Sequence, residues 1–179
     1  DLTNVTSITS SSLTDLGILG AALGNDEFSN GTGITTIALS DTTVDATALT
    51  ATINRFNFIN GLNTTLMTLA SGATINIDAS EPTLIDRILG HETGSIVGGS
   101  ELTISDQNIV VTGSISVDEA NLLSATTTGV VTASITTTES VNELKTLTET
   151  TNAYTIVISS ADATATAEDL NTLDAKTTV

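Results

Sequence analysis

The 179-residue chain is long enough to bury a core without disulfides; it has no Cys or Trp and 2% aromatic residues, and its apolar share of 39% is carried by Leu, Ile, Val and Ala. Large rings usually fill the gaps of a compact globule, whereas stacked layers need only small aliphatic side chains in register, so this composition favours a repetitive structure. The formal net charge of -17 argues against binding to nucleic acid, whose phosphates require Lys and Arg, and no stretch approaches the roughly 18 apolar residues of a membrane span.

Taken in chain order, the sequence repeats an alternating strand followed by a short helical stripe, in about six units. In the long form an acidic turn stands between strand and helix, and in the short form this turn is absent. Internal repetition of this kind predicts units that bury one another's apolar faces. The short form occurs at residues 2–19 and 130–147, the long form at 35–54, 101–129 and 154–178, and a diverged long form at 72–94.

The spacing of apolar residues changes from two in the strands to three and four in the segments that follow. Leu102 and Ile104 alternate with Thr and Ser, which predicts a strand with one apolar and one hydroxylated face, and Ile156 and Ile158 repeat the pattern. In the segment TAED a Thr precedes acidic residues, as at a helix N-cap. The apolar stripe that begins there predicts a short helix. The stripe consists of Ala167, Leu170 and Leu173.

Strands that alternate with short helices are typical of parallel pairing through right-handed crossovers. The sequence therefore predicts a β-rich solenoid of parallel strands alternating with short helices. Residues 1–179 would form a single repetitive domain that serves as a segment or subunit of a longer assembly. The alternative is a compact closed α/β domain, which the irregular Gly-rich segment GNDEFSNGTG at residues 24–33 leaves open.

Several phrases of the sequence, VTSIT, TISD, AEDLNTLDAKTT and VTASITTT, belong to this repeated pattern. They resemble the repeats of very large, Thr-rich surface proteins of cyanobacteria and other aquatic bacteria. The resemblance covers most of the chain, is strongest at residues 129–179 and 1–16, and is weakest at 52–100. It implies an extracellular, repetitive role without enzymatic activity.

The residues that most often carry catalysis are scarce. His91 is the only histidine, and it follows a predicted helix whose C-terminus favours a positive charge, so we expect it to cap that helix. An activated Ser or Thr needs an oriented base, and the chain has neither a second His nor a Cys. We therefore expect a protein that is not an enzyme and needs no cofactor.

Oxygen-bearing side chains at the turns are weak candidates for binding Ca²⁺, which prefers hard oxygen ligands. Neither the EF-hand spacing nor a Gly-Gly-x-Gly-x-Asp nonapeptide is present. The same residue types also make turns and cap helices, and we favour that interpretation. The candidate ligands are Asn25, Asp26, Glu27, Asp41, Asp45 and Asp106.

The two ends of the chain resemble one of its internal joints. SATTTG at residues 124–129 runs directly into VVTASIT at 130–136, while the chain closes on DAKTTV and opens on DLTNVTSIT. Because these ends are complementary rather than identical, we expect head-to-tail contacts with copies of the chain or with neighbouring repeats. The expected interface residues are Leu2, Val5, Ile8, Leu170 and Leu173.

Together these features predict an extracellular or cell-surface structural or adhesive module that stacks end to end into a fibre or surface layer. The acidic, hydroxyl-rich surface favours solubility, and the 4 basic residues give trypsin-like proteases few sites. The alternative is a module that binds sugar, calcium or ice on a Thr-rich face.

Overall fold

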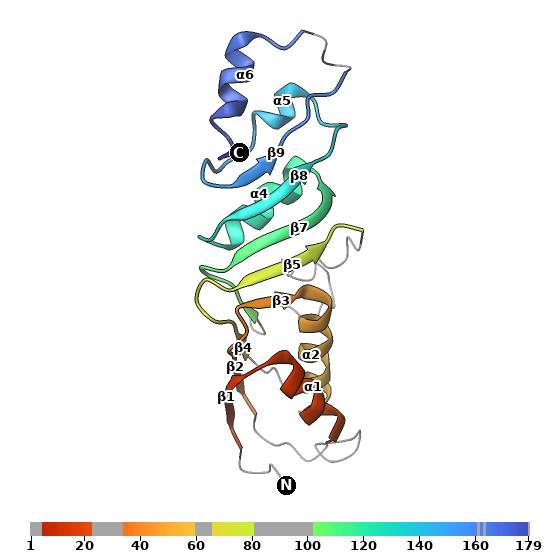
Figure 1. Cartoon of the computed structure of the whole chain (residues 1–179), viewed down its shortest axis with the longest axis vertical. Helices are drawn as coiled ribbons and strands as arrows, with labels where there is room; N and C mark the ends of the chain where they lie inside the picture. The colour runs from red at the N-terminus through yellow and green to blue at the C-terminus, as the bar shows by residue number, and fades with distance from the viewer. Residues whose placement is uncertain are drawn as a thin grey trace.

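The computed structural model describes residues 5–22, 34–59, 66–80, 102–160, 162 and 164–178. Within these residues the chain forms an α/β fold with two all-parallel sheets, five helices and no closed barrel (Figure 1). The first sheet contains β1 (Ser7–Ser11), β2 (Thr36–Leu39), β4 (Leu66–Thr68) and β6 (Leu102–Thr103). The second contains β3 (Thr43–Asp45), β5 (Thr74–Asp78), β7 (Asn108–Ile115), β8 (Val131–Ile135) and β9 (Ala153–Thr155). The helices are α1 (Leu13–Ala22), α2 (Ala46–Ile59), α4 (Val117–Thr126), α5 (Val141–Leu144) and α6 (Ala167–Asp174).

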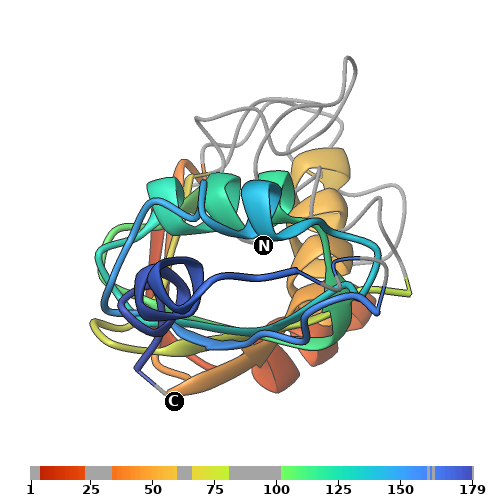
Figure 2. The same cartoon turned by 90° about the horizontal axis from the view of Figure 1, so that it is seen from above.

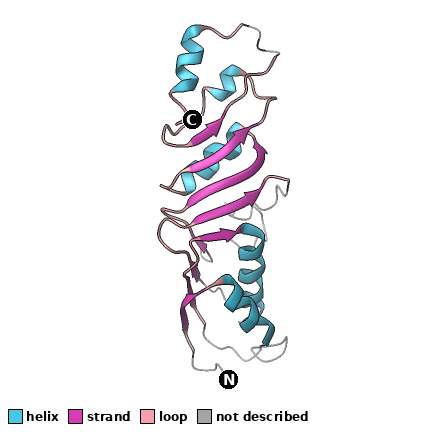
Figure 3. Ribbon diagram, in the orientation of Figure 1, coloured by secondary structure: helices cyan, strands magenta, loops and turns pink. Residues whose placement is uncertain are grey.

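The strand order of both sheets follows the order of the chain. The orders are β1-β2-β4-β6 and β3-β5-β7-β8-β9, and every pair is parallel, which confirms the predicted pairing. Figures 1 and 3 show the strands one above another along the longest axis, with β1 near one end and α6 at the other. We divide the chain into units 1 to 6, which are residues 5–22, 34–59, 66–80, 102–126, 127–147 and 148–178.

Aliphatic side chains of successive units lie in register in the core. Val44 pairs with Ile75, Ile75 with Ile109, and Ile109 with Val131, and all four are buried. Burying each such side chain contributes about 1.5–3 kcal/mol. Seen down the long axis, α4 lies on one side and the strands of the second sheet on the opposite side (Figure 2). The core therefore contains aliphatic rows in register, together with the buried rings of Phe56 and Tyr154.

The predicted strand alternation holds, but two strands end earlier than expected. Leu102 is buried and Thr103 exposed, as predicted, whereas Ile104 lies beyond the end of β6 and is only half-buried. Ile156 and Ile158 lie beyond β9 and are also half-buried. The prediction of strand pairs is therefore correct for Leu102 and wrong for Ile104, Ile156 and Ile158, which lie outside the strands.

The helix starts agree with the sequence pattern. Thr166 is the N-cap of α6 and forms a capping box with Asp169, which confirms the helix predicted from TAED. The helices α4 and α5 begin with the same device, formed by Ser116 with Glu119 and by Ser140 with Glu143. Each box satisfies backbone N–H groups that the helix itself leaves free.

Candidate assembly surface at β9 and α6

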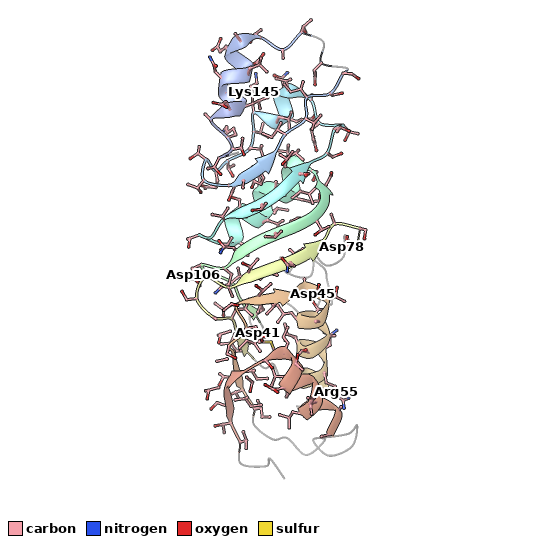
Figure 4. The ribbon with its side chains drawn as sticks, in the orientation of Figure 1. Asp41, Asp45, Arg55, Asp78, Asp106 and Lys145 are labelled. Atoms are coloured by element: carbon pink, nitrogen blue, oxygen red, sulfur yellow. The ribbon has the colours of Figure 1, made fainter. Side chains whose placement is uncertain are left out.

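The helix α6 is fixed to α5 by a cross-unit ion pair. Lys145 Nζ lies 2.6 Å from Asp169 Oδ1, and the other carboxylate oxygen accepts hydrogen bonds from the Thr166 backbone N–H and hydroxyl. These contacts, with Lys145 the largest contributor, lower the pKa of Asp169 to about 2. The first turn of α6 is therefore tied to unit 5 (Lys145 is labelled in Figure 4).

Below α6, a buried polar network holds β9. Asn152 Oδ1 accepts a hydrogen bond from the Val131 N–H at 2.8 Å, and its Nδ2 donates to Ser124 Oγ and to the Tyr154 hydroxyl at 2.9 and 3.0 Å. The Tyr154 hydroxyl in turn donates to the Ala120 carbonyl at 3.3 Å. Tyr154 is fully buried, and burial raises the pKa of its hydroxyl. Three units are joined through these side chains.

Two threonines close unit 6 over β9. The Thr177 hydroxyl accepts from the Tyr154 N–H and donates to the Tyr154 carbonyl, at 2.9 and 2.8 Å. The Thr178 N–H and hydroxyl both donate to the Asn152 carbonyl, at 3.0 and 3.2 Å. We call these two residues the unit 6 corner.

The unit 6 corner repeats a corner that opens unit 5. The Thr127 hydroxyl donates to the Gln107 carbonyl at 2.6 Å, and the Thr128 N–H and hydroxyl both donate to the Ser105 carbonyl, at 2.7 and 3.0 Å. In unit 5 this corner leads directly into β8, which lies on β7. The repeated Thr-Thr phrase of the sequence thus donates to two backbone carbonyls in each case, which lie before β7 at the first corner and at the start of β9 at the second.

An open apolar pocket lies between β9 and α6. Its volume is about 370 Å³, and four of its eight lining residues are aliphatic. Leu170 on its rim is 47% exposed, and among the described strands β9 pairs only with β8. The Tyr154 N–H and carbonyl on β9 are already bonded to Thr177, so the open feature at this end is the apolar pocket. The lining residues are Tyr154, Thr155, Ile156, Ile158, Leu170, Leu173, Asp174 and Thr177.

Acidic residues also connect successive units, which the sequence analysis did not predict. In three helices the first backbone N–H donates to a carboxylate of the following unit. In the sequence, each of these acceptors is an Asp or Glu that stands one or four residues before the N-cap of the next helix. The pairs are Leu13 N–H with Asp41 at 2.8 Å, Val117 N–H with Glu139 at 3.2 Å, and Val141 N–H with Asp162 at 3.0 Å.

The calcium candidates among the described residues lie apart from one another. Asp41 accepts from the start of α1, Asp45 accepts from the Ala48 N–H at 3.0 Å at the start of α2, and Asp106 accepts from Ser71 and Gln107 side chains. Figure 4 shows the three carboxylates at separate places. In the described ranges no three His, Cys, Asp or Glu residues are grouped to hold a metal. Asn25, Asp26, Glu27 and His91 lie outside the described residues.

The expected interface residues lie at opposite ends of the molecule. Leu170 and Leu173 line the pocket, with Leu173 buried, while Val5 and Ile8 are half-buried near β1 and Leu2 lies outside the described residues. The strand β1 is one edge of the first sheet, whereas β9 is one edge of the second. A direct β1–β9 pair would therefore join strands of different sheets.

None of the described helices combines the length and apolar composition needed to cross a membrane. No family model, curated protein or solved structure matches the chain.

Proposed function

We propose that the chain is an extracellular structural or adhesive repeat module that stacks end to end into a fibre or surface layer. The observation that carries this proposal is the end formed by β9 and α6, where a partly exposed apolar pocket lies beside the last strand of the second sheet. Contacts at such an end are heterologous, and heterologous contacts that do not close into a ring propagate. Its partners are copies of the chain or neighbouring repeats.

The proposed architecture is a solenoid of about six units. Strand orders that follow the chain, aliphatic rows in register and carboxylates that join successive units all favour it. A compact α/β domain with the same two sheets is the alternative, and a measurement of molecular shape separates the two.

The extracellular, non-enzymatic part of the proposal rests on composition and on the resemblance to Thr-rich surface repeats. A net charge of -17 keeps a long assembly soluble, and the 4 basic residues leave few sites for trypsin-like proteases. The same charge makes the copies repel one another, so stacking requires screening by salt on the order of 0.15 M.

Sedimentation velocity of the 179-residue chain, over a range of concentrations at that ionic strength, tests stacking between copies. We expect a series of species that grows with concentration, and electron microscopy of the same samples should show end-to-end particles. Leu170→Glu should keep the chain monomeric, because it places a charge beside the pocket.

Leu122→Glu is the matched control. Leu122 is 40% exposed on α4, near the 47% of Leu170, but lies outside the pocket. This variant should sediment like the wild type. A wild-type chain that stays monomeric at every concentration would refute stacking between separate copies.

The Thr-rich face gives less support to the alternative of ice or sugar binding. One outward row of the second sheet contains five different residue types in register. This row therefore lacks the regular array of hydroxyl groups that could order water for ice binding. The row runs Asp45, Asn76, Val110, Thr132 and Ala153.

A further inference from the structure

The unit 6 corner lies along the outer edge of β9, where the chain returns from α6 (Figure 1). Asn152 and Tyr154 are two residues apart, so their backbone groups face the same edge of the strand. Thr177 bonds to the Tyr154 N–H and carbonyl at 2.9 and 2.8 Å, and Thr178 bonds to the Asn152 carbonyl at 3.0 and 3.2 Å. The corner therefore occupies the edge of β9 that faces away from β8.

On β7 the same row of the sheet is bonded to the next strand. The row of Ile109 on β7 and Val131 on β8 continues to Asn152. The Ile109 N–H donates to the Val130 carbonyl at 3.0 Å, next to the paired residues of β7 and β8. Where β7 offers its edge to a strand, β9 has its edge bonded to two threonines.

The two corners differ in register. At the first corner, Thr127 and Thr128 bond to Gln107 and Ser105, which precede β7 and leave its edge open to β8. At the unit 6 corner, the Thr-Thr pair bonds four residues further along the row, at Asn152 and on β9 itself. A hydroxyl that both accepts and donates can replace the two bonds that one residue of an added strand would make. The shift in register thus turns a joint into a cover for a strand edge.

We propose that the unit 6 corner is an edge-blocking device, which prevents a strand of a second copy from adding to β9. Exposed strand edges pair readily with strands of other chains, and such pairing leads to aggregation. Because the outward N–H and carbonyl of Tyr154 are occupied, a second copy contacts this end through the side chains of the pocket. The inference is independent of the proposed function, since the edge is blocked in the monomer whether or not copies stack.

Hydrogen exchange of the 179-residue chain tests the bonds of the corner. Thr177→Val removes the hydroxyl and keeps the shape of the side chain, so the Tyr154 N–H should exchange roughly five- to tenfold faster than in the wild type. Thr177→Ser keeps the hydroxyl and should keep the protection. The Val131 N–H, which bonds to Asn152, should stay protected in both variants and shows that β9 remains in place. Unchanged exchange of the Tyr154 N–H in Thr177→Val would overturn the inference.

Sedimentation velocity tests what the corner prevents, at an ionic strength on the order of 0.15 M. The background is Leu170→Glu, which places a charge beside the pocket. In this background, Thr177→Gly with Thr178→Gly removes both hydroxyls and loosens the corner, and the chain should associate more strongly than Leu170→Glu alone. The Tyr154 N–H should regain protection as the concentration rises, because it then bonds to a strand of another copy.

The matched control is Thr127→Gly with Thr128→Gly in the same background, since β8 covers the edge of β7 at that corner. This control should associate no more than Leu170→Glu alone. The inference is overturned if the variant of the unit 6 corner associates no more than its background, or if the control associates equally, which would assign the association to lost stability. Stacking through the pocket is suppressed in all of these chains, so its failure and the failure of edge blocking are distinguishable.

Discussion

At the scale of single residues, Asn152 connects three units with one buried amide. Its bonds to Val131, Ser124 and Tyr154 are all buried, so removing the amide leaves the Val131 backbone N–H without its acceptor in the core. We expect Asn152→Ala to lower the free energy of unfolding by about 2–3 kcal/mol.

Asn108→Ala is the control for that change. Asn108 makes the equivalent bond to the Val130 N–H at 2.9 Å, but its surroundings are exposed and water can replace the amide. Urea denaturation should show a loss below about 1 kcal/mol for this variant. Equal losses for the two variants would contradict the structural role assigned to Asn152.

The lowered pKa of Asp169 predicts how the stability of the fold changes in acid. Its folded pKa of about 2 lies below the ordinary value of 3.8, so the carboxylate stabilises the folded state above pH 3.8 and loses that contribution as the pH falls toward 2. Asp169→Asn should be less stable than the wild type at pH 7 and should lose less stability between pH 4 and pH 2. Thermal unfolding across that range measures both effects, with Glu168→Gln on the same turn as the charge-matched control; parallel pH curves for wild type and Asp169→Asn would exclude the assigned ion pair.

At the scale of elements, each carboxylate that caps a helix of the preceding unit couples two layers. Glu139→Ala should cost about 1 kcal/mol, as for the loss of a helix cap, because the first N–H of α4 loses its acceptor. Glu149→Ala removes an exposed acid from the segment before β9 and should change stability by less than about 0.5 kcal/mol. If the two variants unfold at the same urea concentration, the cross-unit cap contributes nothing.

The strand alternation and the capping boxes were predictable because both depend on residues close together in sequence. The early ends of β6 and β9 were not, since Ile104 and Ile156 continue the apolar pattern and only the three-dimensional path of the chain takes them out of the sheets. The cross-unit caps join residues 21 to 28 positions apart, so their partners depend on how the units stack. The pocket depends on the same stacking, and Leu170 and Leu173 were predicted there only from the resemblance between the ends and the internal joint.

At the scale of the whole molecule, the central claim is that the units stack in single file. Rows such as Val44, Ile75, Ile109 and Val131 place one aliphatic residue per unit, so each unit is buried mainly by its neighbours. Stability in such an array is close to a sum of units and interfaces, which makes the shape of the particle the property that a compact alternative does not share.

Small-angle X-ray scattering of the monomeric Leu170→Glu variant tests that claim directly. A compact domain of 179 residues has a radius of gyration of about 16 Å. The stacked arrangement predicts a clearly larger radius and a distance distribution with a long tail, as expected for the elongated molecule in Figure 1. A radius near 16 Å with a symmetric distribution would contradict the solenoid and support the compact α/β domain.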